Sequence, residues 1–87
     1  MPDITVYGTS TCNDCRRSKR LLDDHQVAYR WVNIETDPVA TAMVLELNRG
    51  ARVIPTIVFA DGSFLAEPSD AELAAKLALL GSSATQG

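Results

Sequence analysis

Two cysteines, Cys12 and Cys15, stand three residues apart between two segments of different character, and this arrangement restricts the fold more than any other feature. Residues 4–7 before them form a short β-branched run followed by a glycine, which predicts a strand. The polar stretch after them predicts a helix over residues 13–24, with the hydroxyl side chains of residues 9–11 as its caps. The thiol pair is therefore expected where a strand passes into a helix.

This junction gives the two thiols different environments. The first turn of a helix offers unpaired N–H groups and a partial positive charge, which stabilise a thiolate. We expect Cys12 in that turn and Cys15 one turn further in, where the two can close a disulfide with little backbone movement. Cys12 would attack a disulfide, and Cys15 would resolve the mixed disulfide that forms.

Charged residues lie close to the two thiols in the sequence. Arg16 and Arg17 oppose the helix dipole, which favours a thiolate or an anionic substrate beside them; the alternative is that both are solvated helix formers. Asp14 would disfavour a thiolate at Cys12, although an acid is also common at a helix start. Zinc needs about four ligands, and His25, the remaining candidate, is expected to cap a helix end, so we expect no metal.

The middle of the chain predicts a second strand and a second helix. Residues 29–34 read as the strand. Asp37 is expected to cap the helix, with Pro38 at its first position and residues 48–50 ending it. Apolar residues at helical spacing predict its buried face: Ala40, Met43, Val44 and Leu47.

The last third predicts a hairpin and a final helix. Residues 57–60 read as a strand buried on both faces, and Asp61-Gly62 predicts a two-residue turn into a returning strand at residues 64–65. Ser69 and Glu72 form a capping box, and Gly81 is the expected helix end. The buried face of this helix is expected to carry Leu73, Leu77 and Leu80.

The element order is β-α-β-α-β-β-α, which predicts an α/β fold with a four-stranded mixed sheet and helices on both faces. The 87 residues, of which 46% are hydrophobic, suffice for one core, so we expect one domain over residues 1–81 and a flexible tail over 82–87. With a cysteine pair after the first strand, this order is the minimal thioredoxin fold.

Pro55 stands at the head of the predicted central strand, where a residue without an N–H group is unfavourable. A cis Ile54–Pro55 bond facing the cysteines would explain it and would leave the Ile54 backbone free to pair with an extended substrate. The alternative is an ordinary trans turn proline. The cysteine pair and the strand order favour the cis bond.

Charge and hydropathy limit the partners. The net charge of −3, with acids and bases mixed along the chain, argues against nucleic acid as a partner. The chain has no signal-peptide pattern at residues 1–4 and no apolar run of transmembrane length, so we expect a cytoplasmic protein without a membrane partner, and a monomer. Structural disulfides are rare in the cytoplasm, which favours a catalytic cysteine pair.

The chain resembles the glutaredoxins, and more closely the mycoredoxins of actinobacteria, over about residues 4–80. The resemblance rests on four stretches: Cys12-Asn13-Asp14-Cys15 followed by Arg17 and Lys19; Val53-Ile54-Pro55-Thr56; Phe59-Ala60-Asp61-Gly62-Ser63; and Pro68-Ser69-Asp70 to Leu77. It implies Cys12 as nucleophile and Cys15 as resolving thiol. It implies a low-molecular-weight thiol as co-substrate, no bound cofactor, disulfide-containing or thiolated proteins as partners, and a disulfide reductase for recycling. The expected substrate-binding residues are Arg17, Val53, Ile54, Pro55, Ser69 and Asp70.

The chain also departs from the usual glutaredoxin pattern. Asn13-Asp14 replaces Pro-Tyr or Gly-Tyr between the cysteines, Thr11 stands where an aromatic residue is frequent, and Ala66-Glu67 replaces Gly-Gly before the last helix. These changes favour mycothiol over glutathione. Two alternatives stay open: an NrdH-type electron donor to ribonucleotide reductase, and a non-enzymatic module that senses redox state or holds an iron–sulfur cluster.

Overall fold

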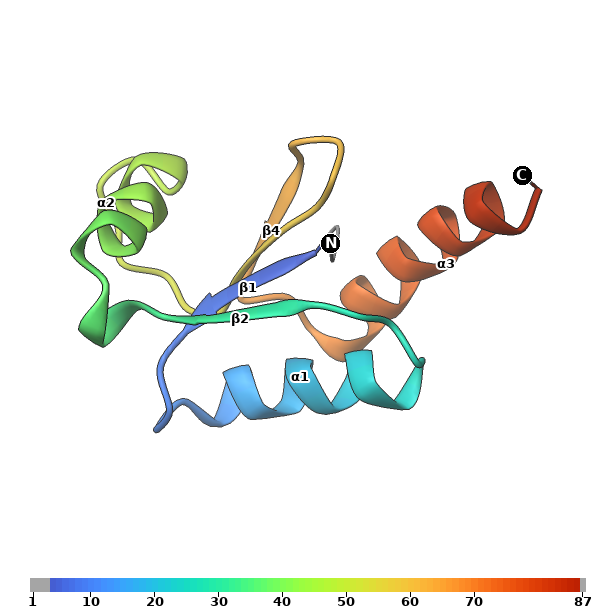
Figure 1. The fold of residues 1–87 in the computed structure, drawn as a ribbon, viewed down its shortest axis with the longest axis horizontal. Helices are drawn as coiled ribbons and strands as arrows, with labels where there is room; N and C mark the ends of the chain where they lie inside the picture. Colours follow the sequence, from blue (N-terminus) through green and yellow to red (C-terminus); the bar gives the residue numbers. More distant parts are fainter. Residues whose placement is uncertain (1–3, 87) are drawn as a thin grey trace.

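The computed structural model describes residues 4–86 and contains four strands, three α-helices and one short 3₁₀ helix (Figure 1). Their bounds are β1 Thr5–Gly8, α1 Asn13–Asp24, β2 Arg30–Asn33, η1 Ile34–Thr36, α2 Pro38–Leu47, β3 Thr56–Val58, β4 Phe64–Ala66 and α3 Asp70–Gln86. The predicted order of strands and helices is confirmed, and α1 and α2 have the predicted bounds. β2 is shorter than the predicted strand at both ends: it begins at Arg30, and Ile34 begins the 3₁₀ helix η1.

The sheet is mixed, with the strand order β2-β1-β3-β4. β1 pairs with β2 in parallel and with β3 in antiparallel orientation, and β3 pairs with β4 in antiparallel orientation. The parallel pair needs the α1 crossover, whereas β3 and β4 need only a hairpin. This arrangement confirms the fold class predicted from the sequence.

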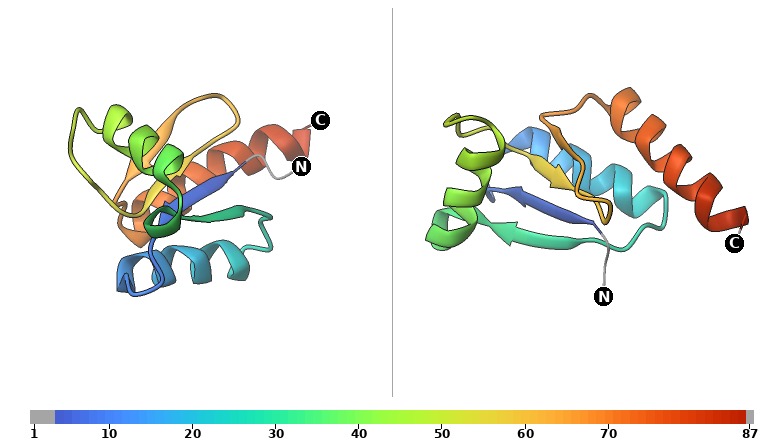
Figure 2. Two further views of the ribbon diagram at one scale, coloured as in Figure 1. Left: turned by 60° about the vertical axis from the view of Figure 1, so that its left-hand side comes forward. Right: turned by 90° about the horizontal axis from the view of Figure 1, so that it is seen from above.

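Helices cover both faces of the sheet, as predicted: α1 and α3 lie on one face and α2 on the other (Figures 1 and 2). On the α1–α3 face the buried core consists of Ile4, Val6, Leu22, Ile57, Phe59, Leu73 and Leu77. On the α2 face the buried core is smaller and consists of Ile34, Ala40 and Val44. No helix among residues 4–86 is long and apolar enough to cross a membrane.

Helix α2 follows its predicted caps, but of the four residues predicted for its buried face only two are buried, and Leu47 is half-buried. The Asp37 carboxylate accepts the Ala40 N–H at 3.0 Å, and Pro38 occupies the first turn. Ala40 and Val44 are buried, but Met43 remains 37% exposed. Its sulfur accepts a hydrogen bond from the Tyr7 hydroxyl at 3.4 Å, at the rim of the interface rather than inside it.

The hairpin between β3 and β4 differs from the predicted two-residue turn. The Gly62 N–H bonds to the Phe59 carbonyl at 3.0 Å, and the Phe59 N–H bonds to the Ser63 carbonyl at 2.8 Å, so three residues form the loop. A two-residue Asp-Gly turn requires positive φ at both positions. Only Gly62 has it, with φ of 86°. Phe59 therefore closes the turn instead of extending β3.

The start of α3 is as predicted and its end is not. Ser69 and Glu72 bond reciprocally: the Ser69 N–H donates to the Glu72 carboxylate at 2.9 Å, and the Glu72 N–H donates to the Ser69 hydroxyl at 3.1 Å. The predicted helix end at Gly81 is wrong, because α3 continues through Gly81 to Gln86. The flexible tail over 82–87 stays a prediction, and Gly87 and the Leu80 side chain lie outside what the structure describes.

Candidate active site

Cys12 is the N-cap residue of α1. Its extended backbone, with φ of −81° and ψ of 117°, turns the chain from β1 into the helix. Its Sγ accepts the backbone N–H of Cys15 at 3.1 Å, the bond that an N-cap side chain makes to the third helical residue. The predicted capping by hydroxyls of residues 9–11 is therefore wrong, since the sulfur occupies that position. The Cys12 side chain is half-buried, and its sulfur lies at the positive end of the helix dipole.

Cys15 lies inside the first turn and is fully buried. Burial raises the pKa of its thiol from an ordinary value of 9.0 to about 12, and the hydrogen bond with Cys12 acts in the same direction. The backbone N–H of Thr9 donates to the Cys15 sulfur and partly opposes this rise in pKa. The structure thus pairs an accessible thiol with a buried, protonated one on a single helical turn.

Gly8, the last residue of β1, lies against the Cys15 sulfur. A Cβ atom at position 8 would overlap the Cys15 Sγ and would lie 3.1 Å from Cη2 and 3.2 Å from Cζ3 of Trp31. A side chain at position 8 would therefore displace Cys15. Neither Gly8 nor Trp31 belongs to a local sequence motif that indicates contact with the cysteines, so their place at the site could not be predicted from the sequence.

Pro55 lies at the end of the sheet where α1 begins. Tyr7 pairs with Thr56 in the antiparallel ladder, so Gly8 and Pro55, the next residues outward, lie at the same edge. The Ile54–Pro55 peptide bond is cis, as predicted. The ladder of β3 begins at Thr56, so the Ile54 backbone stands outside it.

A buried polar network supports the loop before β3. The hydroxyl of Thr56, which is fully buried, donates to the Val53 carbonyl at 2.7 Å and accepts from the Asn48 side chain at 3.1 Å. Asn48 is the C-cap residue of α2. The end of α2 is thereby tied to the segment that carries Val53, Ile54 and Pro55.

Arg17 joins the start of α1 to the start of α3. Its guanidinium lies 3.2 Å from the Asp14 carboxylate and 3.1 Å from the Asp70 carboxylate. Arg16 instead donates to the Ser10 backbone carbonyl at 3.0 Å. From the sequence, both arginines were expected to be solvated or to lie beside a thiolate or an anionic substrate. In the structure, both instead bind oxygen atoms of the protein itself. All these side chains are substantially exposed, so the pairs contribute little stability.

The segment before α3 approaches Pro55. The Glu67 N–H donates to the Pro55 carbonyl at 2.7 Å, and Glu67 itself has a positive φ of 48°. Its side chain is exposed. The Glu67 backbone therefore lies at the same edge of the sheet as Pro55.

The structure brings the predicted site residues to one edge of the sheet through three connections. Arg17 pairs with Asp70, the Glu67 N–H bonds to the Pro55 carbonyl, and the Thr56 network holds the Val53–Pro55 segment. Ser69, also a predicted site residue, caps α3 directly before Asp70. Their roles in binding substrate stay predictions. His25 caps the end of α1, where its Nδ1 lies 2.9 Å from the Leu21 carbonyl oxygen. Within the described part of the chain, no three His, Cys, Asp or Glu residues are grouped as metal ligands would be.

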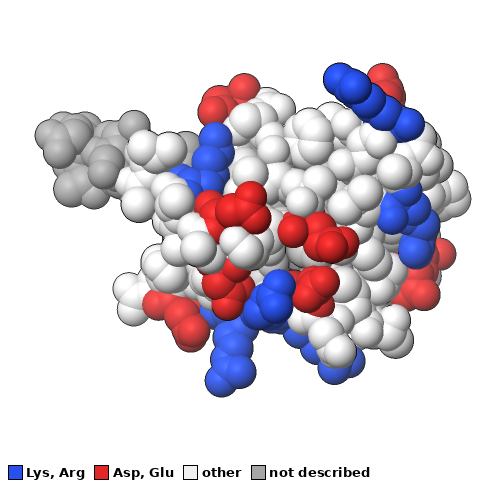
Figure 3. Space-filling model, turned by 180° about the vertical axis from the view of Figure 1, so that it is seen from behind, with Lys and Arg blue, Asp and Glu red and all other residues white. Residues whose placement is uncertain are grey.

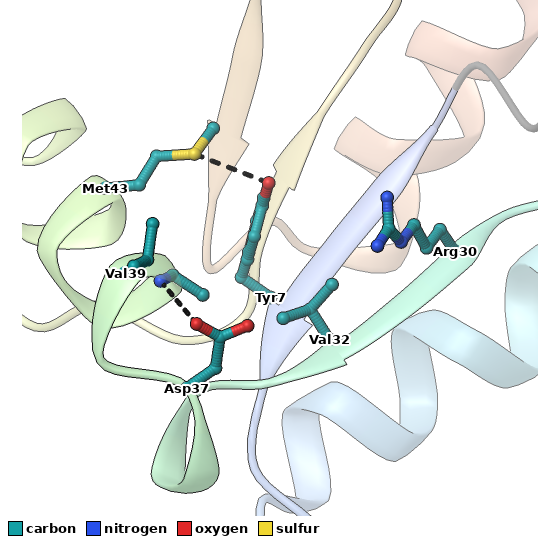
Figure 4. Close-up of a pocket in the computed structure, with 7 residues that line it drawn as sticks. Tyr7, Arg30, Val32, Asp37, Val39 and Met43 are labelled. Atoms are coloured by element: carbon teal, nitrogen blue, oxygen red, sulfur yellow. Dashed lines mark hydrogen bonds between the residues drawn. The ribbon is translucent and has the colours of Figure 1, made fainter.

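A separate hollow of about 180 Å³ lies on the opposite face of the sheet. Tyr7, Arg30 and Val32 of the sheet and Asp37, Val39 and Met43 around α2 line it (Figure 4). Tyr7 and Val32 pack with the α2 core, whereas Trp31 packs with the α1–α3 core. The hollow is therefore not part of the cysteine site.

Acidic and basic side chains are mixed on the surface seen from behind. Several acidic side chains lie close together near the middle of this view, with basic ones below and beside them (Figure 3). A continuous basic surface, which phosphate backbones require, is not present on the face drawn.

A dithiol at the start of the first helix, with a cis-proline at the same edge of a β-α-β-α-β-β-α fold, defines a redoxin of the thioredoxin fold. The solved structure of NrdH-redoxin from Escherichia coli shares this fold, with a TM-score of 0.67 and 23% identity, covering 80% of this chain and 88% of that one.

The glutaredoxin family model matches residues 4–65. The chain is 45% identical over 74 residues to a protein of Mycobacterium tuberculosis named as a glutaredoxin, covering 85% of this chain and 88% of the relative. It is 32% identical over 80 residues to mycoredoxin 1 of Corynebacterium glutamicum, covering 92% and 99%. The chain therefore belongs to the glutaredoxin family, and its predicted resemblance to the mycoredoxins is confirmed.

Proposed function

We propose that this chain is a thiol–disulfide oxidoreductase that reduces protein disulfides and mixed disulfides between proteins and a low-molecular-weight thiol. The observation that carries the proposal is the asymmetry of the two cysteines. Cys12 is half-buried at a helix N-terminus and accepts a backbone N–H, whereas Cys15 is fully buried behind it. This is the arrangement that dithiol exchange needs: one accessible nucleophile and one thiol held back for the second step.

The reaction proceeds by two exchanges. The Cys12 thiolate attacks the substrate disulfide, forms a mixed disulfide and releases the first thiol. Cys15 then loses its proton and attacks the Cys12 sulfur, which releases the second thiol and leaves a Cys12–Cys15 disulfide. A small thiol can replace Cys15 in the second step when the substrate is a mixed disulfide with that thiol. A low-molecular-weight thiol or a disulfide reductase then restores the dithiol.

We propose mycothiol as the preferred small thiol. Glutathione carries a net negative charge, whereas mycothiol has a neutral sugar–inositol head. The groups that could receive an anion beside Cys12 are occupied by the chain's own carboxylates: Arg17 pairs with Asp14 and Asp70, and Glu72 bonds at the start of α3. Glu67 adds a further exposed negative charge, which should repel glutathione. The similarity to mycoredoxin 1 supports the same choice.

The test uses one model protein linked by a disulfide to mycothiol or to glutathione in matched assays. We expect Cys12→Ser to be inactive, because it lacks the first nucleophile, and Cys15→Ser to keep much of the activity, because the small thiol completes the second step. An inactive Cys15→Ser would favour the NrdH-type dithiol route over this one.

The same assay tests the choice of thiol. We expect faster reduction of the mycothiol adduct, and we expect Glu67→Gln to narrow the difference by improving the glutathione reaction. Glu46→Gln, on α2 and exposed, is the control for a change in net charge alone. Equal rates for the two adducts in the wild-type protein would contradict the preference for mycothiol.

A further inference from the structure

The single tryptophan of the chain lies beside the buried thiol. Trp31 is in β2 and pairs with Val6 of β1, so its side chain projects to the sheet face that α1 covers. The edge of its ring and the Cys15 sulfur approach the same point, the missing Cβ of Gly8. Because Gly8 has no side chain, the Trp31 ring and the Cys15 sulfur can both pack against its backbone.

Lys19 holds the ring from the helix side. Its Nζ lies 3.9 Å from the centroid of the Trp31 ring, which is the geometry of a cation–π contact. Lys19 is four residues after Cys15, so both side chains belong to the same face of α1. One turn of the helix therefore presents the thiol and the cation to the same ring.

We propose that Trp31, held by Lys19, is a positioning residue that keeps the Cys15 thiol directed toward Cys12 for the second exchange step; this rests on the function proposed above. The position of the Cys15 sulfur changes by rotation about one bond only, the Cα–Cβ bond. Gly8 and the Trp31 ring approach that sulfur from the sheet, and the Cys12 sulfur lies near it on the helix, where it accepts the Cys15 N–H at 3.1 Å. The Gly8 backbone and the Trp31 ring therefore limit the positions that the Cys15 sulfur can take.

The step that Trp31 assists is the second exchange, in which Cys15 releases the substrate from Cys12. The Cys15 sulfur attacks the Cys12 sulfur of the mixed disulfide, and the Cys15 proton passes to solvent. The new Cys12–Cys15 bond forms as the bond from Cys12 to the substrate sulfur breaks, and the substrate leaves as a thiolate. Because the reacting sulfurs must be aligned, a small displacement of Cys15 should slow this step more than the first attack by Cys12.

The two steps can be followed separately with dithiobis(nitrobenzoic acid), an aromatic disulfide that releases one coloured thiolate in each exchange. With the fully reduced protein, the first release reports Cys12 and the second reports attack by Cys15. We expect Trp31→Ala to slow the second release roughly tenfold while changing the first by less than about twofold. Lys19→Met, which keeps the aliphatic stem, should slow the second release by about threefold.

Lys76→Met is the matched control, because Lys76 lies over the Phe59 ring at 5.2 Å on α3, away from Cys15. It should leave both releases unchanged. Trp31→Ala also removes a side chain that packs against the core and could therefore weaken the fold. Lys19→Met leaves this side chain in place, so it tests the role of Trp31 without that loss, and the tryptophan emission provides a second measurement. The emission should differ between the dithiol and disulfide forms, and Lys19→Met should change that difference.

The outcomes separate this inference from the proposed function. Equal second-release rates in the wild-type protein, Trp31→Ala and Lys19→Met would overturn the role of Trp31 and leave the dithiol mechanism standing. An equal slowing of both releases would also overturn it, because Trp31 would then only support the fold. If Cys12→Ser reacted as fast as the wild-type protein, the order of attack in the proposed function would be wrong.

Discussion

Cys12 and Cys15 occupy one helical turn, and their difference comes from where each stands in it. The N-cap position lies at the end of the helix, so the Cys12 sulfur reaches solvent while accepting an N–H from the turn. The third helical position faces the sheet, so Cys15 is enclosed by Gly8 and Thr9 and its pKa rises. Both residues are cysteines, so the difference in their expected roles comes from the difference in their burial and hydrogen bonding.

The raised pKa of Cys15 predicts a loss of stability in alkaline solution. The unfolded chain releases this proton near the ordinary pKa of 9.0, whereas the folded protein retains it until about pH 12. Between these values the unfolded state binds fewer protons, so the free energy of unfolding falls as pH rises, by at most about 1.4 kcal/mol per pH unit.

Denaturant unfolding of the wild-type protein and of Cys15→Ala across this pH range measures the effect. The wild-type protein should lose more stability than Cys15→Ala as pH rises. Tyr29, whose pKa is also raised by burial, contributes equally to both proteins and cancels in the comparison. Parallel stability curves would show that Cys15 has the same pKa in the folded and the unfolded protein, which would contradict the raised pKa.

At the scale of elements, the site lies where two helices begin. α1 begins with a sulfur cap and α3 with a capping box, whereas α2 begins with an aspartate cap away from the cysteines. Two of these starts were predictable because an Asp-Pro pair and a Ser-x-x-Glu pattern act within a few residues. The sulfur cap was not, because cysteine is an unusual N-cap residue and three hydroxyl residues directly precede it.

The capping box of α3 predicts a measurable cost when it is broken. Ser69→Ala removes the acceptor of the Glu72 N–H and should lower the free energy of unfolding by about 0.5–2 kcal/mol. Ser10→Ala is the matched control, since Ser10 is exposed and only its backbone carbonyl is engaged by Arg16. Its effect should stay within about 0.5 kcal/mol. Urea unfolding of both variants makes the comparison, and equal stabilities would contradict a role for the cap.

At the scale of the whole molecule, the α1–α3 face carries most of the buried apolar side chains. α3 crosses this face, with Leu73 and Leu77 in the core and Leu79 exposed. The helix therefore supports both the sheet and, through Asp70 and Arg17, the start of α1. Loss of its packing should loosen the site together with the fold.

Two leucine substitutions on α3 test this assignment. Leu73→Ala leaves a cavity at a fully buried position and should cost about 2–5 kcal/mol. Leu79→Ala, on the same helix at a position that is 69% exposed, should change stability by less than about 0.5 kcal/mol. Thermal or urea unfolding distinguishes the two, and a similar cost for both would show that α3 does not pack as described.

The sequence by itself determined the features that depend on near neighbours. These are the order of the strands and helices, the bounds of α1 and α2, the capping box of α3 and the place of the cysteine pair at a helix start. Hydrophobic spacing, caps and turn residues act over a few positions, so they can be read along the chain.

Only the tertiary structure decided which distant residues meet. It placed Trp31 and Gly8 against Cys15, paired Arg17 with Asp70, and joined Glu67 to Pro55. It also converted the expected two-residue hairpin into a three-residue loop and carried α3 past Gly81. The physical reason is that these contacts join residues of different strands, helices and loops, or depend on the final twist and packing of the sheet, which no short stretch of sequence specifies.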